Sequence, residues 1–256
     1  GETARACMPT ILQAFLGRPD DTPAGDAFER RLYVCRRTIE KKADAEFALR
    51  DKIFYVCSMS SRTIVYKGMQ VATQMRRFFI DLHDAAVKTA VALVHSRYST
   101  NTTPSWERAH PNRFIIHNGE INTLKGNVNW IRAREHNLYS PVLQHDLERV
   151  MPIINREGSD SAILDNVLEF LVMNGRPLTR AASMLLPEPW DHNDSLSEER
   201  RAYDAYQSML MEPWDGPASI VFSDGDVMGA VLDRNGLRPS RYYITDDDQV
   251  ILASEV

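Results

Sequence analysis

Three short polar segments contain the residue types that could do chemistry, and they read HSRYSTNTTP, HNGEINT and GSDS. In the first, Arg97 carries a planar fork of N–H donors that matches a carboxylate. In the second, the side-chain amide of Asn118 stands beside the backbone N–H of Gly119, a pair that can stabilise a developing oxyanion. In the third, the carboxylate of Asp160 could bind an ammonium group.

Each of these residues also has an ordinary structural interpretation. An arginine after a strand more often forms a structural ion pair, Asn-Gly is the commonest hairpin turn, and an aspartate suits a helix start. His95 and His117 invite a metal or general-base role, but no Asp, Glu or Cys completes a recognisable ligand spacing. The isolated motifs therefore leave the function open.

Strands and helices alternate around these segments. Runs rich in β-branched and aromatic residues predict strands at Ile53–Cys57, Thr63–Lys67, Val91–His95, Arg113–His117, Ser219–Phe222, Val227–Asp233, Arg241–Thr245 and Gln249–Ala253. Helical periodicity predicts helices over Phe28–Lys42, Gln70–Asp81, Asn129–Asn137, Ser161–Met173 and Ser197–Met211. The first two polar segments directly follow predicted strands, so their side chains should emerge together at a strand end.

The last four predicted strands are separated by turn-forming residues, which indicates an antiparallel meander. Strands that pair locally, with helices outside them, predict an α+β layered fold. The sequence has no internal repeat and no clear linker, so one domain is the simplest organisation.

Composition excludes several classes of protein. The 256 residues are 43% hydrophobic and 25% charged, which excludes a disordered chain. A net charge of −5 without a basic block argues against a nucleic-acid partner, and no apolar run approaches the ~18 residues of a membrane span. Three cysteines without a C-x-x-C pair indicate a reducing compartment. We expect a soluble protein of the cytoplasm, or of the plastid if its source is a photosynthetic eukaryote.

Longer stretches around the motifs resemble the class II glutamine amidotransferases, and within them the amidotransferase domain of the glutamate synthase large subunit. These stretches are HSRYSTNTTPSWERAHPNRFIIHNGEINTLKGNVNWIRARE, GSDSAILDNVLEFLVMNGRPL, LLPEPW, LMEPWDGPASIVFSDGD and GAVLDRNGLRPSRYY. The resemblance runs from about Phe28 to Val256, and HNGEINTLKGN and DRNGLRPSRY distinguish glutamate synthases from more distant relatives.

The resemblance implies a role for each polar residue. Arg97 would bind the α-carboxylate of glutamine, with Thr100 as a helper. Asn118 and Gly119 would form the oxyanion hole, and Asp160 would bind the α-ammonium group. A carboxylate clamp, an ammonium clamp and an oxyanion hole together define a free amino-acid amide as substrate.

In the resembled family the nucleophile is a cysteine at the N-terminus of the mature chain, whose own α-amino group acts as base. Cys7 is followed by Met-Pro-Thr, Cys35 lies in a predicted helix, and Cys57 cannot supply an α-amino group. We therefore expect the catalytic cysteine to lie upstream of this chain, and the chain alone to be inactive.

The resemblance also implies the fold: a four-layer αββα sandwich of the N-terminal nucleophile hydrolase type, incomplete at its N-terminus. Residues 1–256 would be most of one type 2 amidotransferase domain, without its first strands. The turn Asp233–Pro239 is expected beside the catalytic cysteine, where Arg238 or Asn235 orders it.

For this chain the resemblance implies no cofactor and no metal. FMN and an iron–sulfur cluster are expected in the rest of the subunit, where channelled ammonia aminates 2-oxoglutarate. The expected partners are L-glutamine, the synthase domain of the same polypeptide, and an electron-transfer subunit or ferredoxin, with no nucleic acid and no membrane.

Two other functions stay open at this point. One is a non-catalytic, amidotransferase-like module that binds glutamine or a partner. The other, with least support, is an unrelated amidohydrolase that uses a metal at His95 and His117.

Overall fold

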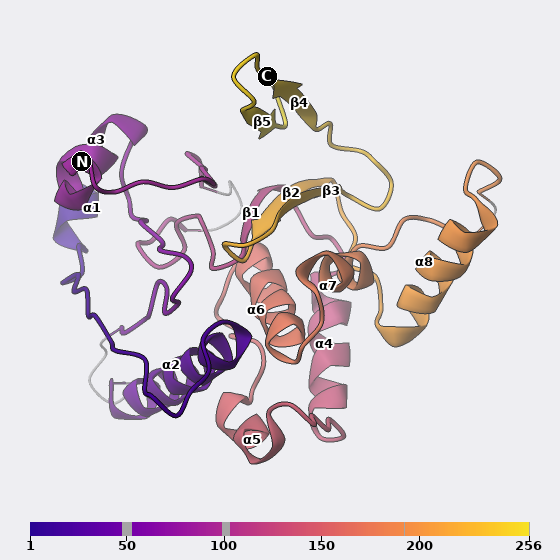
Figure 1. The fold of residues 1–256 in the computed structure, drawn as a ribbon, viewed down its shortest axis with the longest axis horizontal. Helices are drawn as coiled ribbons and strands as arrows, with labels where there is room; N and C mark the ends of the chain where they lie inside the picture. The colour runs from indigo at the N-terminus through magenta and orange to yellow at the C-terminus, as the bar shows by residue number, and fades with distance from the viewer. Residues whose placement is uncertain (48–52, 99–102, 192, 256) are drawn as a thin grey trace. The chain divides into compact units, whose positions relative to one another are not determined.

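The chain forms helices and antiparallel strands, and it falls into two units in the computed structural model. Figure 1 shows the order of these elements along the chain. The structure describes residues 1–47, 53–98, 103–191 and 193–255. Unit 1 comprises Gly1–Arg113 and Tyr139–Met151, and unit 2 comprises Phe114–Leu138 and Pro152–Val256. The mixture of helix and antiparallel sheet confirms the α+β expectation at this level, whereas the four-layer arrangement stays a prediction.

Unit 1 is mainly helical in its regular structure. Its elements are α1 (Glu2–Ala6), α2 (Asp26–Phe47), α3 (Ala72–Phe78), η2 (Ile80–His83), η3 (Gln144–Asp146) and α5 (Leu147–Val150). Helix α2 buries Phe28, Leu32 and Tyr33 at helical spacing, which is the apolar stripe that made this helix predictable. The predicted helix Gln70–Asp81 occurs as two pieces, α3 and η2.

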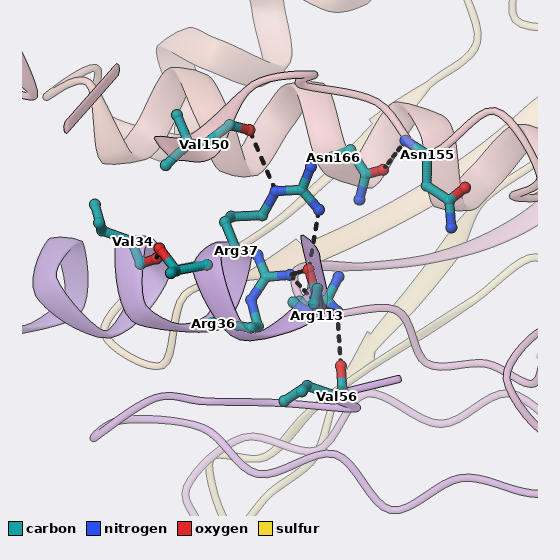
Figure 2. A network of polar contacts seen from close by, with 10 residues as sticks. Val34, Arg36, Arg37, Val56, Arg113, Val150, Asn155 and Asn166 are labelled. Carbon is teal, nitrogen blue, oxygen red and sulfur yellow. Dashed lines mark hydrogen bonds and ion pairs between the residues drawn. The ribbon is translucent and has the colours of Figure 1, made fainter. Parts of the chain in front are cut away.

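A partly buried ionic cluster ties α2 to other parts of unit 1. Arg36 Nη1 donates to both oxygens of the Glu40 carboxylate at 2.9 Å. Arg37 and Arg113 each donate a further hydrogen bond to this carboxylate, at 2.9 and 3.0 Å. Arg37 also donates to the Val150 carbonyl of α5, and Arg113 donates to the Val56 carbonyl (Figure 2). The Glu40 carboxylate and the arginines bound to it therefore join four chain segments of unit 1.

The electrostatics of this cluster favour the ionised carboxylate. Burial alone would raise the pKa of Glu40, because it disfavours the charged form. The guanidinium groups of Arg36, Arg113 and Arg37 outweigh burial and hold the Glu40 pKa below its usual value. The carboxylate thus remains charged at neutral pH.

Three strand predictions in unit 1 are wrong. The structure places Ile53–Cys57, Thr63–Lys67 and Val91–His95 in irregular backbone. Their β-branched side chains suit a half-buried pleated surface, but a strand also needs a neighbour with which to form a ladder. None of the three has such a partner within the described residues, and Ile53 and Val94 are 77% and 76% exposed.

Unit 2 contains all the strands that the structure describes. They are β1 (Ile115–Gly119), β2 (Ala218–Ser223), β3 (Met228–Leu232), β4 (Arg241–Ile244) and β5 (Val250–Ala253). They form an antiparallel sheet in the order β1-β2-β3 and a separate hairpin, β4-β5. The predicted four-strand meander is therefore wrong at one step, because the chain leaves the first sheet between β3 and β4.

The core of unit 2 lies where α6 (Asp160–Met173) packs against β1 (Figure 1). Helix α6 is buried along most of its length, with Ile163, Leu164 and Val167 at most 3% exposed. Ser159 caps its N-terminus by accepting a hydrogen bond from the Ala162 backbone, and the chain turns at Gly175 with φ 85°. The prediction of a helix here is confirmed, but it is not one-sided: the polar residues Asp165 and Glu169 are buried along with the apolar ones.

Three further helices complete unit 2: α4 (Leu124–Glu135), α7 (Leu178–Leu185) and α8 (Glu198–Leu210). Two of them correspond to predicted helices, whereas α7 was missed because its 8 residues are too few for a clear periodicity. In the described part of the chain, no helix combines the length and apolar content that a bilayer crossing requires.

The ionic cluster around Glu40 predicts a pH-dependent stability. Replacing Glu40 with Gln should lower the free energy of unfolding by about 3 kcal/mol at pH 7, because three guanidinium groups lose their shared carboxylate. Because the folded pKa is lowered, this stabilisation is complete above the ordinary value of 4.5 and is lost as pH falls through the folded pKa. Denaturant unfolding at several pH values measures both effects.

The matched control is Asp44→Asn, an exposed carboxylate on the same helix, which should change stability by no more than about 0.5 kcal/mol. A difference between the wild type and Glu40→Gln that stays constant from pH 7 to pH 3 would contradict the electrostatic account.

Candidate functional site

Asn118 and Gly119 lie in a strand rather than in a hairpin turn. The β1–β2 register pairs Asn118 with Ser219 and Gly119 with Ala218. Strand periodicity puts Ile115 and His117 in the interior and leaves Asn118 exposed on the other face. The hairpin interpretation of Asn-Gly is therefore wrong, and the Asn118 side chain projects from the sheet face that does not carry the buried residues.

Two glycines allow the chain to pass very close to itself just after this point. Gly119 has φ +141°, and a Cβ there would lie 1.9 Å from the Pro217 carbonyl oxygen. Gly216 has φ +149°, and a Cβ there would lie 2.1 Å from the Glu120 carbonyl oxygen. The approach is secured by a hydrogen bond of 3.1 Å from the Glu120 backbone N–H to Pro217. A side chain at Gly119 would therefore displace this turn.

Two carboxylates of α6 hold β1 at its two ends. Asp165, which is 1% exposed, accepts bonds of 2.8 and 3.0 Å from the backbone N–H groups of Phe114 and Ile115. Asp160 accepts a bond of 3.1 Å from the backbone N–H of Ile121, beyond the other end. The structure thus brings Asp160 next to the segment that carries Asn118. Its role as a helix cap is excluded, because Ser159 is the cap.

The side-chain amide of Asn118 is held from two sides. Arg238 Nη1 donates to Asn118 Oδ1 at 3.2 Å, and Asn118 Nδ2 donates to Ser254 Oγ at 3.0 Å. Ser254 directly follows β5, and Arg238 lies in the loop between β3 and β4. Segments from three parts of unit 2 therefore meet at this one amide.

The loop that carries Arg238 is organised by Asp233. This carboxylate, 4% exposed as a residue, accepts hydrogen bonds from the backbone N–H groups of four residues: Ala218, Asn235, Leu237 and Arg238. Burial alone would raise the Asp233 pKa, but these four donors outweigh it and lower the pKa. Since Ala218 is the register partner of Gly119, Asp233 links the Arg238 loop to the strand beside the glycine.

Asn235 in the same loop donates to the Asp215 carboxylate at 3.3 Å. Asp215 in turn accepts a bond of 2.7 Å from the Asn122 backbone through its carbonyl oxygen. Through Asp215, the loop is thus linked to the segment that follows Asn118. Sequence reasoning singled out Arg238 and Asn235 for a cysteine; the structure places them against Asn118 and Asp215.

Arg97 belongs to unit 1, whereas Asn118, Gly119 and Asp160 belong to unit 2. The Arg97 side chain is exposed, and its guanidinium has no ion-pair partner within the described residues, so the structural ion pair is not observed there. The Arg97 backbone N–H donates to Nδ1 of His95 at 3.3 Å. Thr100 lies outside the described residues.

The three cysteines have different surroundings. Cys7 and Cys35 are exposed, and Cys57 is partly buried. Burial raises the pKa of the Cys57 thiol, and Lys67 and Arg113 offset this only in part, so the thiolate that nucleophilic attack requires is disfavoured there. Among the described residues, no group of three or more His, Cys, Asp and Glu side chains is placed to hold a metal ion.

Sequence reasoning missed Asp165, Asp233 and Ser254. Asp165 had no clear signal, because helical spacing puts it opposite the apolar residues Ile163, Val167 and Phe170, where a charged residue is expected to face solvent. Asp233 did have a signal, because an aspartate two residues before Asn-Gly suggests an Asx-type turn. Ser254 had none, because only the tertiary structure brings it to Asn118.

The whole chain matches a known family. The family model described as "Glutamine amidotransferases class-II" matches residues 1–256.

Curated relatives are similar over the full chain. It is 53% identical over 256 residues to the NADPH glutamate synthase large chain of Bacillus subtilis. It is 49% identical over 257 residues to the NADH glutamate synthase of Saccharomyces cerevisiae, and 46% identical over 258 residues to ferredoxin-dependent glutamate synthase 2 of Synechocystis. The alignments cover 100% of this chain but only 17%, 12% and 16% of these relatives, so the chain spans a small part of their length.

The close backbone approach at Gly119 generates a stability prediction. Gly119→Ala should lower the free energy of unfolding by at least about 2 kcal/mol, because its Cβ would meet the Pro217 carbonyl at 1.9 Å and the positive φ would be strained. Thermal or denaturant unfolding measures the change.

The matched control is Gly126→Ala in α4, where a Cβ would meet nothing within 4 Å. This substitution should stabilise the protein by up to about 1 kcal/mol, because alanine favours the helix. Equal effects of the two substitutions would show that the contact at Gly119 does not constrain the turn.

Proposed function

The chain belongs to the class II glutamine amidotransferase family, and from that premise we propose that it is the glutaminase domain of a glutamate synthase large chain. In this function the domain hydrolyses the side-chain amide of L-glutamine to give glutamate and ammonia. The family match over residues 1–256 and the full-chain similarity to three glutamate synthases favour this function over a non-catalytic binding module.

The observation that carries the proposal is the hydrogen bond between Asp160 and the Ile121 backbone. It ties a carboxylate suited to an ammonium group to the segment that carries Asn118 and Gly119. Both oxygens of Asp160 accept backbone N–H groups, from Ser161 at 2.7 Å and from Ile121 at 3.1 Å. Because each carboxylate oxygen has two acceptor positions, Asp160 can still bind the α-ammonium group of glutamine.

The other end of the substrate needs a cation. Arg97 is exposed, and within the described residues no carboxylate competes for its guanidinium. We assign it to the α-carboxylate of glutamine, which it can bind through two parallel hydrogen bonds. Thr100 is assigned as a helper by resemblance alone. By resemblance, a carboxylate clamp and an ammonium clamp together would define a free amino acid as substrate.

The proposed hydrolysis proceeds through a covalent thioester. A cysteine thiolate attacks the side-chain amide carbon, and the carbonyl oxygen becomes an oxyanion that Asn118 Nδ2 and the Gly119 backbone N–H stabilise. The tetrahedral intermediate expels ammonia once its nitrogen is protonated, leaving a glutamyl thioester. Water then hydrolyses the thioester, releasing glutamate and restoring the thiol.

The nucleophile is proposed to be none of the three cysteines in this chain. Cys57 is disfavoured by its raised pKa, Cys35 lies within α2, and Cys7 directly follows α1. On this proposal, residues 1–256 form most of one amidotransferase domain with the four-layer αββα architecture. The catalytic cysteine and the first strands would come from elsewhere in the same polypeptide.

The activity of the whole protein is part of the same proposal. Ammonia would pass to a synthase domain that aminates and reduces 2-oxoglutarate, and FMN and an iron–sulfur cluster would be bound there rather than in this chain. The relatives are named for NADPH, NADH or ferredoxin, which fits an electron-transfer subunit or ferredoxin as partner. We place the protein in the cytoplasm, or in the plastid of a photosynthetic eukaryote.

Loss of one oxyanion donor tests the function. In the complete polypeptide, Asn118→Ala should lower glutamine-dependent glutamate synthesis by about 100-fold or more, because the tetrahedral intermediate loses one hydrogen bond. Synthesis from added ammonia should survive, since it bypasses the amide hydrolysis. Steady-state rates with glutamine and with ammonium chloride, measured on the same preparation, separate the two.

The matched control is Asn122→Ala, four residues later, where the side chain is exposed and only the backbone N–H is used. It should retain both activities. Equal loss of both activities in Asn118→Ala would contradict the oxyanion role, and a wild-type protein that releases no ammonia from glutamine would contradict the proposed function itself.

A further inference from the structure

We propose that Arg238 is a positioning residue for glutamine hydrolysis, because its guanidinium donates to Asn118 Oδ1 and thereby directs Asn118 Nδ2 at the oxyanion. This inference rests on the proposed function and extends it to a residue that does not touch the substrate.

The first step of the argument concerns the chemistry of the amide. The two ends of an asparagine side chain have nearly the same shape, so packing does not decide which end faces the reaction. An arginine can only donate hydrogen bonds. Arg238 at 3.2 Å therefore selects the orientation in which Oδ1 faces the guanidinium and Nδ2 faces away from it.

The second step concerns the donors that remain. Asn118 Nδ2 carries two hydrogens, and Ser254 Oγ accepts one of them at 3.0 Å. The second hydrogen remains for the oxyanion. A charged donor on Oδ1 also polarises the amide and strengthens Nδ2 as a donor, because successive hydrogen bonds reinforce one another.

The third step concerns how firmly Arg238 itself is placed. Its own backbone N–H donates to the Asp233 carboxylate at 2.8 Å, and Leu237 donates to the same carboxylate at 2.9 Å. Asp233 also accepts a bond from Ala218, which pairs with Gly119. The backbone that carries Arg238 is thus fixed to the strand that flanks the second oxyanion donor.

The test is a double-mutant cycle in the complete polypeptide. Arg238→Met removes the donors but keeps an unbranched apolar stem, and it should lower kcat for glutamine hydrolysis about 10-fold with little change in KM. In an Asn118→Ala background the same substitution should change kcat less than about twofold, because Arg238 acts through Asn118. Arg238→Lys should restore part of the lost kcat, because its ammonium group can also donate to Oδ1.

A second readout separates positioning from general damage to the site. Iodoacetamide alkylates a thiolate by displacing iodide from a methylene carbon, so the reaction forms no oxyanion. The rate at which it inactivates the enzyme should therefore be unchanged in Arg238→Met. Arg234→Met, an arginine in the same loop that does not contact Asn118, is the control and should retain wild-type kcat.

The outcomes are distinct. The inference is overturned if Arg238→Met lowers kcat equally in both backgrounds, leaves kcat unchanged, or slows alkylation as much as hydrolysis. In each of those cases the wild type still hydrolyses glutamine and the proposed function stands. If the wild type releases no ammonia from glutamine, both the proposed function and this inference fail.

Discussion

The candidate site depends on one constraint: the backbone on either side of β1 has to be held by carboxylates of α6. Asp165 accepts hydrogen bonds from the backbone N–H groups of Phe114 and Ile115, where the strand begins. Asp160 accepts one from the backbone N–H of Ile121, beyond the end of the strand. A strand end is where ladder hydrogen bonds stop, so its N–H groups need other acceptors when they are buried. Because both acceptors belong to one buried helix, the position of Asn118 is coupled to the packing of α6 against the sheet.

Buried carboxylates also hold irregular backbone elsewhere in the chain. The Asp233 carboxylate accepts hydrogen bonds from four backbone N–H groups and so fixes a loop without regular structure. In unit 1, the buried Glu29 carboxylate accepts the backbone N–H and hydroxyl of Ser61 and the hydroxyl of Ser60. A carboxylate can accept several hydrogen bonds at once, so one side chain can satisfy several backbone N–H groups that have no strand partner. These acids are structural, and a count of acidic residues alone would not distinguish them from Asp160.

The sequence predicted the elements whose pattern is local and missed what depends on distant contacts. Helix α6 was predictable because its apolar residues repeat along one face, and β2 and β3 because β-branched runs flank a short turn. The three strand predictions in unit 1 were wrong because a β-branched run does not reveal whether a partner strand lies beside it. For the candidate site, Asn118, Gly119, Arg97 and Asp160 were proposed from residue type and resemblance, and their roles stay predictions. The position of Asn-Gly within a strand and the contact between Ser254 and Asn118 were not predicted. Strand register and long-range contacts cannot be read from a local sequence pattern.

The exposure of Asn118 explains why its neighbours are polar. A buried asparagine can be held by packing on all sides, whereas an exposed one rotates about χ2 with little steric resistance. Asn118 lies on the exposed face of β1, so packing cannot fix its amide. A hydrogen-bond donor at one end of the amide and an acceptor at the other can fix it. The two partners of Asn118 differ in what they allow. Arg238 can only donate, which determines the direction of the amide, whereas the Ser254 hydroxyl both donates and accepts and would adapt to either direction. The direction of the candidate oxyanion donor is therefore set by Arg238, and Ser254 follows it.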